Sequence, residues 1–334
     1  MQLHWIAGCV LWLASAAMAG ETGSAQTLAQ TQTDRAAGIA LQAESRIGND
    51  RVSTSLRNSG LNLRSSSAMV VDQKTGRTLL AKNTDALMPI ASITKLMTAM
   101  VVLDAELPLE EKISIGKEDR DSLKGTHSRL KVGTTLSRHL ALQLALMSSE
   151  NRAAAALARA YPGGVQAFVG AMNRKAASLG MAHTHFVDST GLNSNNASTA
   201  QDLVKMVNAA YTYPLIREIT TTGSYDVAMR GGPRRVQFRN TNQLVRNKSW
   251  DIGVSKTGFI NEAGHCLVMQ ANIANQPMVI VLLDSWGKLS RIGDAQRIKK
   301  WMESSRGAKH RTAILSTPGN GWKTAVAVSA ASGS

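Results

Sequence analysis

Three short motifs stand in a fixed order along the chain: Ser92-Ile93-Thr94-Lys95, Ser149-Glu150-Asn151 and Lys256-Thr257-Gly258. Together they offer a hydroxyl nucleophile, an amine base, a second hydroxyl that can relay a proton, and a cation for an anionic substrate group. Such a set suits attack on a carbonyl carbon through a covalent acyl-enzyme. Because the motifs lie far apart in sequence, the fold has to bring them together.

The first motif places a serine and a lysine three residues apart. On a helix this spacing puts Ser92 and Lys95 on the same face, one turn apart. Lys95 can act as a base only if its pKa falls, which burial among the apolar residues at 96–100 and a nearby cation such as Lys256 would promote. Alone, the spacing is also typical of a helix N-cap followed by a solvated lysine, so the interpretation depends on the other motifs.

The second motif follows an apolar run at 140–147 inside a region that is predicted to be helical. We expect Ser149 to pass a proton between Lys95 and the leaving amine, and the Asn151 amide to hold a peptide group of the substrate. Glu150 is interpreted as a surface residue or a structural support. An ordinary turn between helices remains the alternative for this triplet alone.

The third motif lies between two strand-like stretches. Lys256 and Thr257 can bind a carboxylate through charge and hydroxyl, and Gly258 lets a substrate lie close to the strand. An oxyanion needs two backbone N–H donors, and those of Ser92 and Phe259 are the expected pair.

The segments around these motifs predict a sheet built from both ends of the chain. Residues 68–71 and 78–81 form a hairpin whose turn holds another Lys-Thr-Gly at 74–76, to which we assign no catalytic role. After Pro89 the apolar stretch to Asp104 predicts a helix that is buried on most sides. Further strands are expected at 224–229, 235–239, 253–259, 264–271 and 278–284, and a closing helix at 292–304.

A mainly helical region is inserted between the two halves of the sheet, at about 105–212. Helices are expected at 140–160, at 165–179 with Gly180 as the stop signal, and at 200–210 with Ser198 or Thr199 as the N-cap. The predicted fold class is therefore α/β in the α+β sense: an antiparallel sheet with flanking helices and a helical insert.

The ends of the chain predict export. Residues 1–19 carry no Lys, Arg, Asp or Glu, contain an apolar run too short to cross a bilayer, and end in Ala-Met-Ala, as a secretory signal peptide does. We interpret 20–60 as a flexible leader, 61–306 as the catalytic domain and 307–334 as a disordered tail. A periplasmic protein without a transmembrane segment after cleavage is expected.

Composition limits the partners. The formal charge of +15 favours anionic partners such as the cell envelope surface, whereas 4% aromatic residues and the lack of nucleic-acid-binding motifs argue against nucleic acid. Cleavage after residue 19 leaves Cys266 as the single thiol, which excludes an internal disulfide. No metal site is expected, because His183-x-His185 and His265-Cys266 each lack a spaced third ligand.

With these motifs in this order, the chain resembles the low-molecular-weight penicillin-binding proteins, the serine D,D-peptidases. The resemblance covers about Ser67 to Ser304 and includes residues that flank the motifs. It implies a serine β-lactamase/transpeptidase-like fold and cleavage of D-alanyl bonds in peptidoglycan stem peptides. It also implies covalent inhibition by β-lactam antibiotics and no cofactor. The other segments that support the resemblance are Pro89 to Met100, Asp188-Ser189-Thr190-Gly191-Leu192, Asn240-Thr241-Asn242, and Ala263-Gly264 after the third motif.

The resemblance assigns a role to each motif. Ser92 is the nucleophile and Lys95 the acylation base, with Ser149 and Asn151 as the second motif and 256–258 as the third. The family's carboxypeptidases usually continue into a β-rich domain and an amphipathic anchor, so the short stretch after the catalytic domain favours the endopeptidase branch. A D-alanyl-D-alanine carboxypeptidase is the alternative.

A β-lactamase and a non-catalytic wall-binding protein are less well supported by the sequence. A class A β-lactamase needs a glutamate after the second motif, and Glu218 is the only one before Lys256 and lacks the expected spacing. A non-catalytic wall-binding protein would be favoured by loss of Ser92 or Lys95, and both are present.

Overall fold

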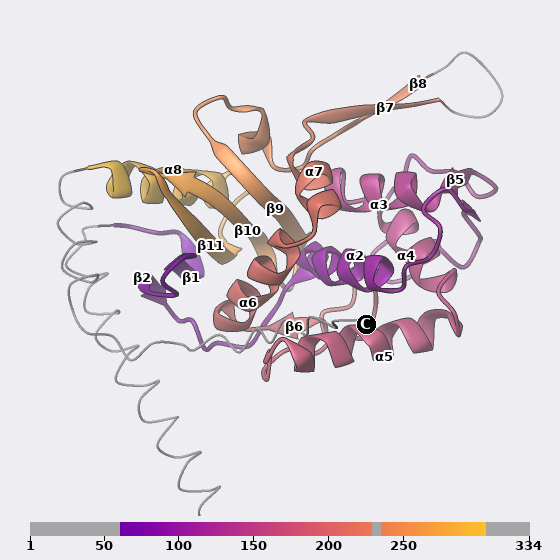
Figure 1. Ribbon diagram of the computed structural model, residues 1–334, viewed down its shortest axis with the longest axis horizontal. Coiled ribbons are helices and arrows are strands. Elements are labelled where there is room, and N and C mark those ends of the chain that lie inside the picture. The colour runs from indigo at the N-terminus through magenta and orange to yellow at the C-terminus, as the bar shows by residue number, and fades with distance from the viewer. Residues whose placement is uncertain (1–60, 229–234, 305–334) are drawn as a thin grey trace, which may run out of the picture. The chain divides into compact units, whose positions relative to one another are not determined.

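A five-stranded antiparallel sheet forms the centre of the protein, with strand order β2-β1-β11-β10-β9 (Figure 1). The computed structural model describes residues 61–228 and 235–304, which belong to the compact unit Val52–Ser334. The predicted signal peptide, leader and tail, and the connection between the strands predicted at 224–229 and 235–239, lie outside the described residues. The strands are β1 (Ser65–Asp72), β2 (Thr78–Lys82), β9 (Asp251–Ile260), β10 (Gly264–Ile273) and β11 (Gln276–Ser285).

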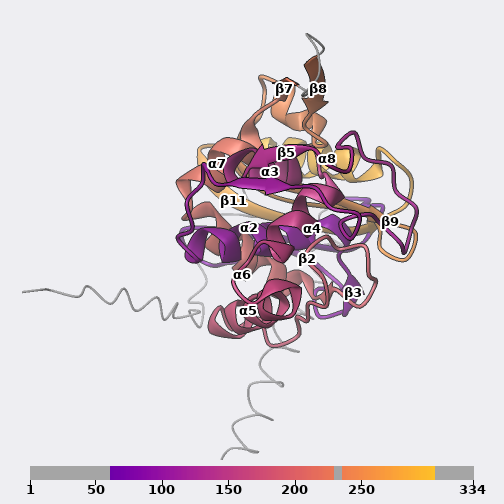
Figure 2. The same ribbon diagram turned by 90° about the vertical axis from the view of Figure 1, so that its right-hand side faces the viewer.

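The sheet is covered on both faces. Val279, Val281 and Leu283 of β11 face the larger core, and Ile280 and Leu282 face the core under α8. Because side chains alternate across a strand, burial on both faces requires this continuous apolar run. α2 (Thr94–Asp104) and α6 (Ala200–Tyr211) lie on one side, and α8 (Ser290–Glu303) lies on the other (Figures 1 and 2).

The hairpin and the buried helix are confirmed. β1 pairs with β2, and Gly76 takes a φ of +70° in the turn, which accounts for the extra Lys-Thr-Gly without chemistry. The predicted helix begins as a 3₁₀ turn, η1 (Ala91–Ile93), and continues as α2, in which residues 94–102 are all buried. Ser92 therefore sits on a rigid, enclosed element.

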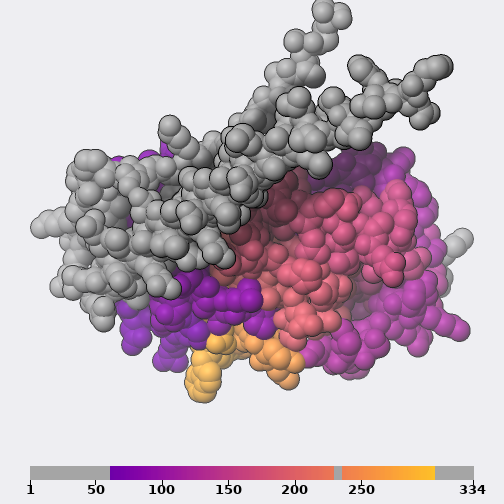
Figure 3. All heavy atoms as spheres, turned by 90° about the horizontal axis from the view of Figure 1, so that it is seen from below, coloured from indigo at the N-terminus to yellow at the C-terminus, as the bar shows by residue number. Residues whose placement is uncertain are grey.

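The inserted region is helical, but its boundaries differ from the prediction. The stretch at 140–160 is two helices, α3 (Arg138–Met147) and α4 (Asn151–Arg159), and the second motif occupies the break between them. α7 (Pro214–Thr221) was not predicted, because Pro214 looked like a break although proline is favoured at the first position of a helix. Figure 3 shows part of the helical region, in magenta and pink, from below.

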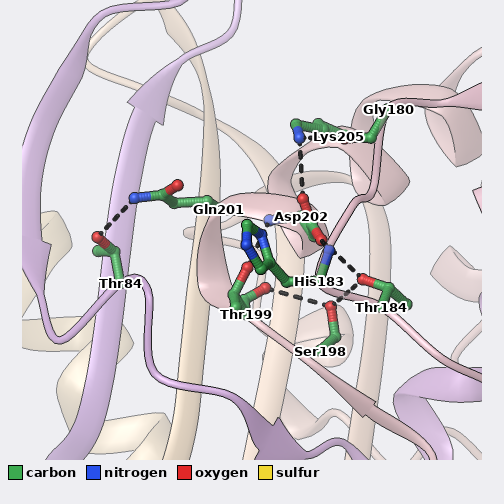
Figure 4. Close-up of polar contacts among 9 residues, drawn as sticks. All are labelled: Thr84, Gly180, His183, Thr184, Ser198, Thr199, Gln201, Asp202 and Lys205. Carbon is green, nitrogen blue, oxygen red and sulfur yellow. Dashed lines mark hydrogen bonds and ion pairs between the residues drawn. The ribbon is translucent and has the colours of Figure 1, made fainter. Parts of the chain in front are cut away.

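The N-terminus of α6 has a fixed polar environment (Figure 4). Of the two predicted caps, Thr199 accepts the hydrogen bond from the backbone N–H of Asp202, at 3.2 Å. The buried Asp202 carboxylate accepts from the His183 backbone N–H at 2.7 Å and from Lys205 at 2.8 Å. This network anchors the chain that leads into α6.

The remaining elements are the long helix α5 (Gly164–Ser178), several short strands and turns, and the hairpin of β7 (Ser224–Ala228) and β8 (Arg235–Arg239), which projects away from the other elements (Figure 1). Among the described residues, no helix is long and apolar enough to cross a membrane. The bounds of the short elements are β3 (Met88–Pro89), β4 (Lys112–Ser114), β5 (Thr135–Ser137), β6 (Ala197–Ser198) and η2 (Gln243–Arg246).

Candidate active site

The fold brings the three motifs into direct contact. Lys95 Nζ lies 2.8 Å from Ser92 Oγ and 2.7 Å from Asn151 Oδ1. Lys256 Nζ lies 2.9 Å from Ser149 Oγ. The second motif, at the junction of α3 and α4, thus contacts both the first motif on η1 and α2 and the third motif on β9.

The partners of Lys95 determine which way its lone pair points. Besides Ser92 Oγ, the amine contacts Asn151 Oδ1 and the Thr190 carbonyl oxygen at 2.6 Å, and both of these oxygens can only accept hydrogen bonds. A neutral amine has two N–H donors, which these two oxygens use. In this neutral form the lone pair of Lys95 is directed at Ser92 Oγ and accepts from the serine hydroxyl, whereas the ammonium form donates to it. The geometry therefore prepares Ser92 for deprotonation.

The protonation state of Lys95 fits this role. Complete burial lowers its pKa from 10.5 to about 7, although the carboxylates of Asp188 and Glu150 act in the opposite direction. The pKa of Lys256 also falls well below its ordinary value, because of burial first and then repulsion by Lys95 and Arg291. The two lysines therefore interact as predicted, but this repulsion lowers the pKa of Lys256. The fall in the pKa of Lys95 comes from its burial.

A tight turn to which the sequence assigned no role supplies the Thr190 carbonyl. The Asp188 carboxylate accepts from the backbone N–H groups of Thr190 at 2.5 Å and Gly191 at 2.6 Å, and from the Thr190 hydroxyl at 2.8 Å. Asn196 ties the turn to α2 by donating to Thr94 Oγ1 at 3.0 Å. An aspartate that caps its own turn is a recognisable pattern, but its link to a distant lysine is not visible in sequence.

Hydrogen bonds with Thr126 and Ser128 hold the second motif in place. Asn151 uses its oxygen for Lys95 and donates through Nδ2 to Thr126 Oγ1 at 3.0 Å, which leaves one amide N–H for a substrate peptide group. Glu150 is 6% exposed and accepts from the Ser128 hydroxyl at 2.6 Å. Its structural role is confirmed, and the surface alternative is wrong.

Ser149 occupies a strained position, with φ of +62°, in the turn between α3 and α4. Its hydroxyl contacts Lys256, which also donates to the Thr257 carbonyl at 2.9 Å. The direct partner of Ser149 in the structure is therefore Lys256, where a relay to Lys95 was expected. Lys256 of the third motif can therefore supply the proton that passes through Ser149.

Two glycines allow the nucleophile segment to lie against its neighbours. A Cβ on Gly258 would lie 2.9 Å from the Ile90 carbonyl oxygen, and one on Gly191 would lie 1.9 Å from that of Ala91. Ala91 itself has a φ of +47°. Gly258 is thus needed for packing of β9 against η1, a reason distinct from the close approach of substrate that the sequence suggested.

The outer part of the third motif lies at the edge strand of the sheet. Thr257 Oγ1 contacts Thr241 Oγ1 at 2.6 Å. Arg291 from α8 donates to the Gly258 carbonyl at 2.8 Å. The Phe259 ring is 52% exposed and stacks on His265 with centroids 4.3 Å apart. An edge strand keeps backbone donors unpaired, as an oxyanion site requires.

Among the residues that the structure describes, neither histidine pair belongs to a cluster of three or more metal-ligating side chains. His265 and Cys266 alternate across β10, with Cys266 fully buried. Burial raises the pKa of the Cys266 thiol to about 11, so it stays protonated at neutral pH.

Comparison with known proteins agrees with this geometry. The sequence profile of a family described as D-alanyl-D-alanine carboxypeptidase matches residues 52–286. The chain is 51% identical to a D-alanyl-D-alanine endopeptidase of Pseudomonas aeruginosa, covering 73% of this chain and 79% of that protein. It is 50% identical to an Escherichia coli protein of the same name, covering 72% and 78%.

Solved structures show the same fold. The Streptomyces K15 DD-transpeptidase superimposes with a TM-score of 0.67 and 30% identity, covering 72% of this chain and 97% of that one. Penicillin-binding protein D2 of Listeria monocytogenes, in its ampicillin-bound form, gives 0.63 and 29%, covering 72% and 98%. The predicted serine β-lactamase/transpeptidase-like fold is confirmed. The chain therefore belongs to the D-alanyl-D-alanine carboxypeptidase family, and it is a serine-type D,D-peptidase.

Proposed function

We propose that this protein is a D,D-endopeptidase that hydrolyses D-alanyl cross-links between peptidoglycan stem peptides through an acyl-enzyme at Ser92. The observation that carries the mechanism is the position of the buried Lys95 amine, whose Nζ lies 2.8 Å from Ser92 Oγ and also contacts Asn151 Oδ1 and the Thr190 carbonyl oxygen. The relatives at 51% and 50% identity are named endopeptidases, whereas a Streptomyces relative named carboxypeptidase is 34% identical. These identities favour the endopeptidase over the carboxypeptidase alternative.

The groups of the site account for each step. Lys95 takes the hydroxyl proton of Ser92 as the serine oxygen attacks the D-alanyl carbonyl, and the N–H groups of Ser92 and Phe259 bind the oxyanion. Ser149, in contact with Lys256, delivers a proton to the leaving amine as the peptide bond breaks. Water then attacks the ester and gives a proton to the Ser149–Lys256 pair, which had lost one. Ser92 leaves the acyl group with the proton held by Lys95, which restores all of these groups. None of these steps needs a cofactor.

Anionic substrate groups have a defined place. Lys256 and Thr257 lie beside the nucleophile on β9, and binding of a carboxylate there would favour the charged form of Lys256. Asn151 offers its remaining amide N–H to the substrate backbone. Gly258 keeps the strand close enough to η1 for both ends of the site to reach one peptide.

β-Lactam antibiotics are expected to acylate the same serine. The Listeria monocytogenes relative is described in its ampicillin-bound form. Among the described residues between the second and third motifs, the only glutamate is Glu218, on α7, and Glu150 is held by Ser128. With no second glutamate between these two motifs to activate water, the penicilloyl-enzyme should hydrolyse slowly, which distinguishes this protein from a class A β-lactamase.

The setting that we infer is the periplasm. The sequence pattern at 1–19, which is typical of a signal peptide, supports export, and the formal charge of +15 supports contact with anionic envelope surfaces. Labelling of periplasmic fractions with a fluorescent penicillin checks this location, and recovery of the protein only in the cytoplasm would contradict it.

Digestion of purified sacculi tests the endopeptidase assignment. We expect cross-linked muropeptide dimers to be converted into monomers, as measured by chromatography and mass spectrometry. The Ser92→Ala protein is the control and should leave dimers intact. Loss of only a terminal D-alanine from pentapeptides, with dimers unchanged, would establish the carboxypeptidase instead.

The pH dependence of acylation should follow Lys95. Because its pKa is about 7, the amine is the neutral base above that pH and an inactive ammonium below it. The second-order rate of penicillin acylation should fall about tenfold per unit below pH 7 and level off about one unit above it. Stopped-flow fluorescence measures this profile. A rate that stays constant through pH 7 would contradict the assignment of Lys95 as the base.

A further inference from the structure

A pocket of about 330 Å³ lies where β11 passes into α8, outside the catalytic cluster. Arg64, Lys288 and Arg297 bring cationic groups to its lining, and Trp286 and Leu289 bring apolar surface. No acidic residue of the described chain lines it. Arg297 is paired with a buried aspartate, whereas no ion pair within the described ranges neutralises Arg64 or Lys288. The pocket therefore combines two uncompensated charges with apolar surface.

The apolar side chains here are unusually open to solvent. Trp286 is 80% exposed and Leu289 is 62% exposed, and Phe259 at the same end of the sheet is 52% exposed. Exposed large apolar groups that gather beside arginine and lysine mark binding surfaces, because their burial against a partner supplies much of the binding energy. The partner has to carry both negative charge and apolar surface.

The pocket lies at the same end of the sheet as the end of β9. Phe259 pairs with His265 on β10, and His265 pairs with Ser285 on β11, next to Trp286. Two strand spacings give a separation of about 10 Å, which about three extended residues can span. Arg291, in the first turn of α8, also donates to the Gly258 carbonyl. A peptide that lies along β9 as far as Phe259 therefore needs about three more residues to reach the end of β11, where the pocket begins.

We propose that this pocket binds the second stem peptide of a cross-linked substrate, through its carboxylates and its apolar groups. The inference rests on the proposed endopeptidase function. A carboxypeptidase releases a single amino acid, which is too short to reach the pocket, whereas an endopeptidase substrate carries a whole peptide on either side of the scissile bond. Arg64 and Lys288 pair with its carboxylates, and Trp286 covers its aliphatic parts.

Binding to the inactive Ser92→Ala protein tests the proposal without turnover. Adding Lys288→Gln and Trp286→Ala should raise the Kd of a cross-linked muropeptide dimer about tenfold and leave the Kd of a monomeric pentapeptide unchanged. Lys300→Gln is the matched control, since it removes the same charge from an exposed position on α8 outside the pocket. It should change neither Kd. Circular dichroism checks that each variant is folded.

In these binding measurements the proposal would be overturned by equal weakening for both ligands, by no weakening for the dimer, or by an equal effect of Lys300→Gln. Binding to phosphatidylglycerol vesicles that requires Lys288 and Trp286, with unchanged dimer binding, would assign the pocket to a membrane surface and also overturn it. Dimer cleavage by protein that retains Ser92 tests the endopeptidase function separately. Pocket-dependent dimer binding without cleavage would reject that function and keep the pocket.

Discussion

Replacing Lys95 by methionine should lower the rate of penicillin acylation by about 10³-fold, within the range for loss of a general base. Methionine keeps much of the apolar stem but cannot accept the Ser92 proton. It also leaves Asn151 Oδ1 and the Thr190 carbonyl without the amine that they now contact. Stopped-flow labelling with a fluorescent penicillin measures the effect.

Lys74→Met is the matched control for this change, because Lys74 is an exposed lysine in the turn between β1 and β2. It should acylate at the rate of the unmodified protein. Thermal unfolding has to show that Lys95→Met remains folded. If the folded Lys95→Met protein acylates within a few-fold of the unmodified rate, another group is the base.

Gly191→Ala should lower acylation by about 100-fold, the cost of displacing a reacting group by about 1 Å. Its Cβ would lie 1.9 Å from the Ala91 carbonyl oxygen and 2.9 Å from the Ser92 backbone nitrogen. The nucleophile segment therefore has to move, and with it one proposed oxyanion donor. Acylation rates and unfolding temperatures should be measured together.

Gly133→Ala separates this collision from backbone strain. Gly133 has a φ of +86°, and a Cβ there would meet no atom within 4 Å. It should lose about 1 kcal/mol of stability, as a residue forced into a positive φ does, and acylate normally. Equal loss of acylation in both variants would show that Gly191 acts only through stability.

Much of the fold was predictable because its signals are local. The hairpin of β1 and β2 follows from two apolar runs around a turn, and the buried η1–α2 segment follows from apolar residues on every side. The order of the three motifs also predicted that they meet. The length and apolar character of β10 and β11 indicated a sheet, whose order only the structure defines.

The parts that were missed depend on contacts between distant segments. The Asp188 turn resembles any capped turn until Thr190 is seen against Lys95. Gly191 and Gly258 resemble ordinary turn and strand glycines until the carbonyls of Ala91 and Ile90 are seen against them. Arg291 lies 33 residues from the Gly258 carbonyl that it contacts. No local pattern encodes these pairings.

The central claim is that the hydroxyl of Ser92 forms the acyl-enzyme. The most direct measurement is to label the protein with penicillin, digest it, and locate the penicilloyl group by mass spectrometry. The account predicts one modified peptide, with the mass addition on Ser92, and no modified peptide from Ser92→Ala. A penicilloyl group on any other residue, or stoichiometric labelling of Ser92→Ala, would contradict it.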